Sequence, residues 1–211
     1  MPLREEISGL DRAALRPQAL DALGLSDHRP TVLVTGGSLG AAQLNDSFAQ
    51  SADALLASGV QVLHLTGAGK VPQALVGRDD SGPGPRYVVL EYCDRMDLAY
   101  AAADAVVCRA GANTVCELTA VGLPGVYVPL PIGNGEQRLN AAGVVEAGGG
   151  LLVEDADVDP AWVAREIVPL LSDRARLESM SAAAAAVGHR DADETLADMV
   201  TEAWVGGGRR G

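Results

Sequence analysis

The fold of this chain is decided by the stretch TVLVTGGSLGAAQLN, residues 31–45. Residues 31–34 form a short, continuous apolar run, residues 36–40 form a glycine-rich loop, and a helix-like pattern follows from 41 to about 57. A buried strand that enters a helix through a glycine loop is typical of a parallel sheet covered on both faces. Glycine lets the backbone approach an anion at the helix N-terminus, where Ser38 could cap the helix or donate to a phosphate oxygen.

The same alternation of apolar runs and helix-like segments continues along the chain. Further strands are expected at residues 60–65, 87–90, 105–108, 125–128 and 150–153. Helices are expected at residues 12–23 with a break at Pro17, and then at 96–103, 114–121, 140–147, 160–171, 173–187 and 192–203. This order predicts a doubly wound, Rossmann-like α/β domain over residues 30–204, after a lead-in at 1–29 and before a flexible tail at 205–211. Ligands of such a sheet bind beyond the carboxyl ends of its strands.

Composition and charge exclude several classes of function. Hydrophobic residues make up 48% of the 211 residues and aromatic residues only 3%, so Ala, Val and Leu must fill the core. The formal net charge of −12 argues against a nucleic-acid partner. It also argues against binding of this chain to anionic lipid through a cluster of basic residues. Cys93, Cys108 and Cys116 lack metal-ligand spacing and are expected to be reduced thiols. No signal-peptide pattern or membrane-length apolar run occurs, so a cytoplasmic location is expected.

Other phosphate-binding and catalytic motifs fit this sequence less well. The pattern G-x-G-x-x-G is not matched, and the second strand ends without the acidic residue that would hold the ribose of NAD. The segment GAGK at 67–70 lacks the upstream glycine and the following Ser or Thr of a P-loop. Residues 36–40 do satisfy G-x-S-x-G, so a hydrolase with Ser38 as nucleophile and His64 or His189 as base remains an alternative.

The most informative segment is VCRAGANTVCE, residues 107–117. Here a strand ends, a loop of small residues turns, and a helix begins near Asn113, so that its free N–H groups and its dipole would face an anion such as a diphosphate. Glu117 lies in the first turns of that helix. Its carboxylate could accept bonds from two vicinal hydroxyls of a ribose, or simply complement the helix dipole. Downstream, Gln137 and Asn140 carry amides that could read sugar hydroxyls.

Taken in order, these segments resemble the MurG family of peptidoglycan N-acetylglucosaminyltransferases. The resemblance rests on MPLR (1–4), TVLVTGGSLGAAQLN (31–45), EYCDRM (91–96), CRAGANTVCE (108–117), GLP (122–124) and GEQRLNA (135–141), which together span nearly the whole chain. It implies that the chain is the C-terminal, donor-binding half of a GT-B glycosyltransferase. The family transfers GlcNAc from UDP-GlcNAc to lipid I, which gives lipid II and UDP.

The resemblance also implies a UDP-GlcNAc site made of three groups of residues. Contacts to the diphosphate are expected from Arg4, Ser38, Ala112, Asn113, Thr114, Val115 and Cys116. Contacts to the nucleoside are expected from the backbone of Cys93 at the uracil edge, from Tyr92 and Met96 around it, and from Glu117 at the ribose. The GlcNAc hydroxyls are expected to meet Gln137, with Asn140 as a further candidate. Glu136 stands where relatives carry a glutamine, which leaves its role open.

The family's amino-terminal domain carries a GGTGGH segment together with the acceptor and membrane surface, and no such segment occurs in this sequence. Met1 falls where the connection between the domains is expected, so we expect a donor half that is inactive alone. The general base is expected in the other half, and no catalytic residue is assigned here. That half would also bind lipid I and the inner face of the cell membrane.

Neither a metal nor a cofactor is expected, because a helix dipole and Arg4 would stabilise the diphosphate and Asp79-Asp80 is typical of a solvated turn. Two alternatives stay open beside the hydrolase. The chain could be a non-catalytic UDP-GlcNAc-binding subunit that needs a partner chain, or an enzyme similar to a UDP-GlcNAc epimerase or hydrolase.

Overall fold

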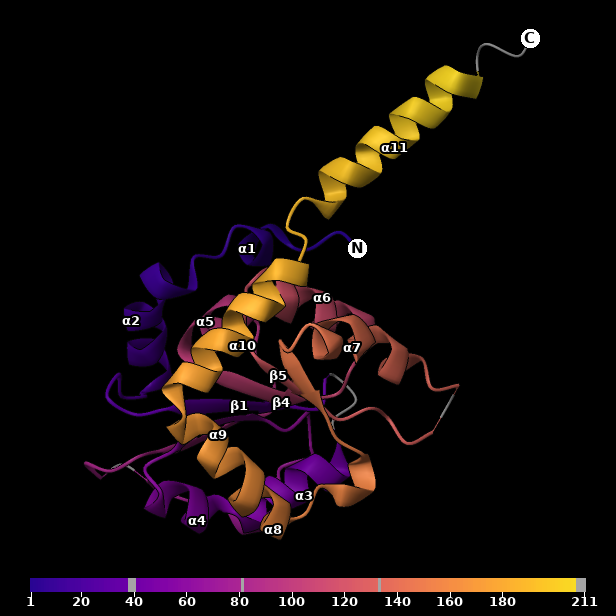
Figure 1. Cartoon of the computed structure of the whole chain (residues 1–211). Helices are drawn as coiled ribbons and strands as arrows, with labels where there is room; N and C mark the ends of the chain where they lie inside the picture. Colours follow the sequence, from indigo (N-terminus) through magenta and orange to yellow (C-terminus); the bar gives the residue numbers. More distant parts are fainter. Residues whose placement is uncertain (38–40, 81, 133, 208–211) are drawn as a thin grey trace.

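The computed structural model describes residues 1–37, 41–80, 82–132 and 134–207, so Ser38 lies outside the described residues. Within them lies one six-stranded parallel sheet with helices on both faces (Figure 1). The strand order is β3-β2-β1-β4-β5-β6, which confirms the predicted doubly wound architecture. The strands are β1 (Thr31–Thr35), β2 (Gln61–Leu65), β3 (Tyr87–Leu90), β4 (Ala105–Cys108), β5 (Gly125–Tyr127) and β6 (Gly150–Leu152).

Two hydrophobic cores lie on the two faces of the sheet, because alternate residues of each strand point to opposite sides. Leu33 of β1 packs in one core, and Val32 and Val34 pack in the other. The first core is covered by α1 (Glu5–Ser8), α2 (Arg12–Leu23), α5 (Met96–Ala102), α6 (Ala112–Ala120) and α7 (Glu136–Glu146). The second is covered by α3 (Ala42–Gln50), α4 (Ala52–Ala57), α8 (Pro160–Trp162) and α9 (Val168–Ser172).

Two helices at the end of the chain complete the fold. Helix α10 (Arg174–Val187) contributes Ala184 to the first core and Met180 to the second, so it spans the side of the sheet. Helix α11 (Ala192–Gly207) projects away from the domain (Figure 1), and it carries the exposed side chains of Leu196, Met199, Val200 and Trp204. None of the helices within the described ranges is both long enough and apolar enough to cross a membrane.

Several helix predictions are wrong in detail. Pro17 does not break α2, because Arg12 and Arg16 on its amino-terminal side hold the helix to carbonyl oxygens at the end of α5. The helix expected at 41–57 is divided at Ser51 into α3 and α4. The helix expected at 160–171 contains a π-helical turn at Val163–Ile167, just before Pro169, which cannot donate the hydrogen bond of a regular α-helix.

Helix α7 begins at Glu136, four residues before the predicted start at 140. Gln137 therefore belongs to the first turn of a helix and not to a loop. Helix α11 continues to Gly207, beyond the predicted end at 203.

Candidate functional site

The candidate site lies where the carboxyl ends of the central strands meet. The register pairs Thr35 of β1 with Cys108 of β4, and Cys108 with Tyr127 of β5, so the loops that follow these strands emerge side by side. After β1, the Thr35 hydroxyl accepts a hydrogen bond of 3.2 Å from the N–H of Gly37. Gly37 has a φ of +75°, a conformation that glycine adopts without strain. The strand therefore turns sharply into the loop that leads to α3.

The N-terminus of α6 points into this edge of the sheet without a side-chain cap. Gly111 precedes the helix in an extended conformation, and the N–H of Val115 bonds to the carbonyl oxygen of Gly111 at 3.0 Å. The N–H groups of Ala112, Asn113 and Thr114 lie ahead of that first helical bond and have no acceptor inside the helix. The helix holds nine residues and has no acidic residue in its first turn, so this end is suited to an anion.

Glu117, one turn into α6, is held between two side chains from distant parts of the sequence. The hydroxyl of Tyr100 donates to Oε2 of Glu117 at 2.6 Å, and Nη2 of Arg4 lies 3.4 Å from Oε1. The Glu117 side chain is 15% exposed and that of Arg4 is 54% exposed. The structure thus brings together Arg4 and Glu117, which the sequence analysis assigned to the diphosphate and the ribose.

The three residues expected around the uracil follow β3. Tyr92 is largely exposed, Cys93 is half-buried, and Met96 is the first residue of α5. Burial raises the pKa of the Cys93 thiol, while a hydrogen bond from the backbone of Arg95 and the nearby charge of Arg4 act in the opposite direction. Cys93 therefore lies near Arg4.

Gln137 and Asn140 hold the loop between β4 and α6. Oε1 of Gln137 accepts hydrogen bonds from the N–H groups of Ala110, at 3.2 Å, and Leu130, at 3.0 Å. Nδ2 of Asn140 donates to the carbonyl oxygen of Ala110 at 3.0 Å. The two amides thus bond to both the N–H and the carbonyl oxygen of Ala110. Nε2 of Gln137 and Oδ1 of Asn140 are the amide atoms that remain for a sugar hydroxyl. Their contact with GlcNAc stays a prediction.

Two residues of this edge were not assigned by sequence reasoning. Arg109 follows β4; its Nη1 donates to the carbonyl oxygens of Val128 and Pro129 and lies 2.5 Å from Oδ1 of Asp155. It therefore ties the ends of β4, β5 and β6 together. Its place beside the loop of small residues could have suggested this role. Tyr100 was missed because an aromatic residue inside an apolar helix pattern predicts a core position.

His64, a candidate base in the hydrolase alternative, has a structural role. It is fully buried in β2, with Nε2 3.0 Å from Oδ1 of Asn45 and Nδ1 2.8 Å from the hydroxyl of Tyr87. Burial lowers the pKa of His64 to about 4. Both ring nitrogens are occupied, so the ring has no free position from which to activate Ser38. The other candidate, His189, is exposed beyond the end of α10.

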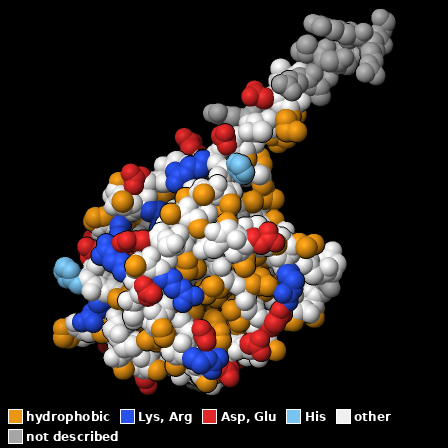
Figure 2. Space-filling view, viewed as in Figure 1, with side chains coloured by type: hydrophobic (Ala, Val, Ile, Leu, Met, Phe, Trp, Pro, Cys, Tyr) orange, Lys and Arg blue, Asp and Glu red, His pale blue; other side chains and the backbone are white. Residues whose placement is uncertain are grey.

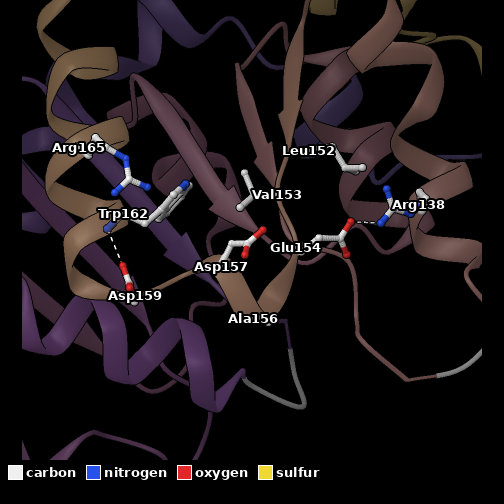
Figure 3. Close-up of a pocket in the computed structure, with 9 residues that line it drawn as sticks. All are labelled: Arg138, Leu152, Val153, Glu154, Ala156, Asp157, Asp159, Trp162 and Arg165. Atoms are coloured by element: carbon white, nitrogen blue, oxygen red, sulfur yellow. Dashed lines mark hydrogen bonds and ion pairs between the residues drawn. The ribbon is translucent and has the colours of Figure 1, made fainter.

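Two hollows in the structure are lined by residues other than those assigned to the donor site. One, of about 530 Å³, lies beside β6 between α7 and α8, and Figure 3 shows Arg138 and Arg165 on its two sides. Of its two cations, Arg138 pairs with Glu154 and Arg165 pairs with Glu166. Figure 2, which is viewed as Figure 1, shows hydrophobic side chains among the charged ones on the face of the molecule that is turned to the reader. The other, of about 1000 Å³, lies at the amino ends of the strands.

In the described parts of the chain, no three His, Cys, Asp or Glu side chains are grouped to hold a metal.

A six-stranded parallel sheet with flanking helices is the architecture of the C-terminal domain of GT-B glycosyltransferases. The chain belongs to glycosyltransferase family 28: residues 31–196 match the glycosyltransferase family 28 C-terminal domain.

Two relatives and a solved structure support the resemblance to MurG. The chain is 57% identical over 212 residues to the UDP-N-acetylglucosamine--N-acetylmuramyl-(pentapeptide) pyrophosphoryl-undecaprenol N-acetylglucosamine transferase of Nocardioides sp.. It is 55% identical over 211 residues to the transferase of that name from Streptomyces coelicolor. Each alignment covers 100% of this chain and 57% of the relative, so the chain spans a little over half the length of these relatives.

Among solved structures, MurG of Acinetobacter baumannii matches with a TM-score of 0.74 and 27% identity, over 87% of this chain and 53% of that chain. A UDP-N-acetylglucosamine 2-epimerase matches with a TM-score of 0.59 and 16% identity, over 92% of this chain and 47% of that one. The second match is a likeness of fold alone.

Proposed function

We propose that this chain is the UDP-GlcNAc-binding half of an N-acetylglucosaminyltransferase that converts lipid I to lipid II in peptidoglycan synthesis. The observation that carries the proposal is the meeting of Arg4 and Glu117 beside the uncapped N-terminus of α6. A cation and three free N–H groups suit a diphosphate, and a neighbouring carboxylate suits the ribose hydroxyls. The identity of 57% to the Nocardioides transferase, across the whole chain, supports this choice of donor.

The residue roles proposed within this site follow the sequence assignments. The diphosphate lies against Arg4, Ser38 and the residues 112–116, and Glu117 accepts the ribose hydroxyls. The uracil lies against Cys93, Tyr92 and Met96. Gln137 and Asn140 offer their remaining amide atoms to GlcNAc while they hold Ala110 in place.

The proposed reaction is an inverting displacement at the anomeric carbon of GlcNAc. The acceptor hydroxyl of lipid I attacks this carbon and loses its proton to a general base of the acceptor half, while the bond to the diphosphate breaks and UDP leaves. The dipole of α6 and the charge of Arg4 stabilise the negative charge that develops on the diphosphate. The acceptor half is also the proposed contact with lipid I and with the cytoplasmic face of the membrane, so the isolated chain binds the donor without transferring its sugar.

A reconstitution experiment tests this proposal. The chain is mixed with the separately expressed amino-terminal half of the Nocardioides transferase, and transfer of labelled GlcNAc to lipid I is measured. Transfer is expected only when both halves are present, and it should be lost with Glu117→Ala but kept with Glu146→Ala, an exposed carboxylate at the end of α7. Donor binding without transfer in the mixture would favour a non-catalytic binding subunit. Release of UDP from UDP-GlcNAc by the chain alone would favour an epimerase-like or hydrolase-like enzyme.

A further inference from the structure

We propose that Tyr100 is a positioning residue that orients the carboxylate of Glu117 toward the ribose hydroxyls of the donor nucleotide. This inference rests on the proposed donor site and deepens it. Tyr100 does not itself contact the ribose, because it is only 2% exposed. It acts through the hydrogen bond of 2.6 Å from its hydroxyl to Oε2 of Glu117.

The tyrosine is held firmly at both ends. Its ring is buried in the first core. Its carbonyl oxygen accepts a hydrogen bond of 3.1 Å from Nε of Arg12, which also donates to Ala103 at the end of α5. Burial raises the pKa of Tyr100 well above its ordinary value, and the adjacent Glu117 carboxylate raises it further. The hydroxyl therefore stays protonated and donates to Glu117.

The two oxygens of Glu117 consequently differ. Oε2 is bonded to a buried, immobile donor, while Oε1 faces Arg4, a half-exposed cation at 3.4 Å. A carboxylate has about four acceptor positions, so Oε1 and the second position on Oε2 remain for two vicinal hydroxyls once Arg4 moves to the diphosphate. A carboxylate fixed in one plane before the ligand arrives loses less rotational freedom on binding.

The test compares two ligands that differ only in the groups that Glu117 would bind. UDP and 2′,3′-dideoxy-UDP are titrated into the full chain by calorimetry, and the ratio of their dissociation constants is taken. The variants are Tyr100→Phe and Tyr127→Phe. Tyr127 is a matched control, because it is equally buried and its hydroxyl has no hydrogen-bond partner within the described residues. Circular dichroism spectra establish that both variants are folded.

We expect the wild-type chain and Tyr127→Phe to bind UDP about tenfold more tightly than the dideoxy compound. In Tyr100→Phe the ratio should fall at least about fivefold, through weaker binding of UDP alone. An unchanged ratio in Tyr100→Phe, or an equal loss of affinity for both ligands, would overturn the positioning role. Equal binding of the two ligands by the wild-type chain would also overturn it and would leave donor binding intact. Failure of the wild-type chain to bind UDP would instead remove the proposed donor site.

Discussion

Replacing Arg12 with methionine removes three hydrogen bonds that join α2 to the rest of the first core. The Arg12 guanidinium donates to the carbonyl oxygens of Tyr100 at 3.1 Å, Gly122 at 3.0 Å and Ala103 at 2.6 Å. Hydrogen bonds from a charged donor contribute about 1.5–3 kcal/mol each. Burial lowers the pKa of Arg12 to about 10 although the Asp104 carboxylate raises it, and this net shift offsets about 3 kcal/mol of that gain.

We therefore expect Arg12→Met to lower the free energy of unfolding by about 3–5 kcal/mol, because three carbonyl oxygens also lose their donor. The melting temperature should fall by about 6–20 °C at roughly 2–4 °C per kcal/mol for a domain of this size. Urea unfolding followed by circular dichroism measures the effect. Arg174→Met is the matched control, since its side chain is 92% exposed and pairs with Glu178, and its midpoint should not change. A loss below about 1 kcal/mol in Arg12→Met would refute this reasoning.

Two further predictions concern pH and close packing. Burial lowers the pKa of His64 from 6.5 to about 4. Between these pH values the unfolded chain binds a proton at His64 that the folded chain does not, so the free energy of unfolding should fall as the pH decreases from 6.5 to 4. Urea titrations should show this slope, and an unchanged slope in His64→Gln would contradict its assignment to His64. In Gly149→Ala the new Cβ would lie 2.5 Å from the backbone nitrogen of Ala184, so a lower melting temperature is expected. Gly143→Ala meets nothing within 4 Å inside α7 and should raise the melting temperature; a fall there would contradict this account.

The sheet could be predicted from the sequence because both of its faces are covered. A strand buried on both sides is mostly apolar, and β1, β2 and β4 are buried at every residue, with only Thr31, Thr35, Gln61 and His64 polar among them. The glycine loop after β1 and the small residues before α6 then indicated which edge would bind a ligand. Local pattern was therefore sufficient for the doubly wound architecture, and the ligand site at this edge stays a prediction.

The remaining features depend on contacts between distant residues. Pro17 is tolerated in α2 because Arg12 and Arg16 reach α5, which no local pattern reveals. The same holds for the site, where the hydroxyl of Tyr100 in α5 bonds to the carboxylate of Glu117 in α6, 17 residues along the chain. Gln137 was predicted to contact the GlcNAc hydroxyls, and the structure adds that its amide oxygen accepts a hydrogen bond from the backbone of Ala110. Sequence motifs indicated which residues lie at the carboxyl edge of the sheet. The fold determines which atoms of these residues remain free of hydrogen bonds within the protein and can bind a ligand.

The central claim is that this chain alone forms a UDP-GlcNAc site around Glu117. The most direct measurement is a calorimetric titration of UDP-GlcNAc, with UDP-glucose as the comparison ligand, into the wild-type chain and Glu117→Ala. The account predicts saturable binding that prefers UDP-GlcNAc and that falls at least about tenfold in the variant, as expected for the loss of hydrogen bonds to a charged acceptor. Equal binding by the wild-type chain and by Glu117→Ala, or a folded wild-type chain that binds neither ligand even with the acceptor half present, would contradict it.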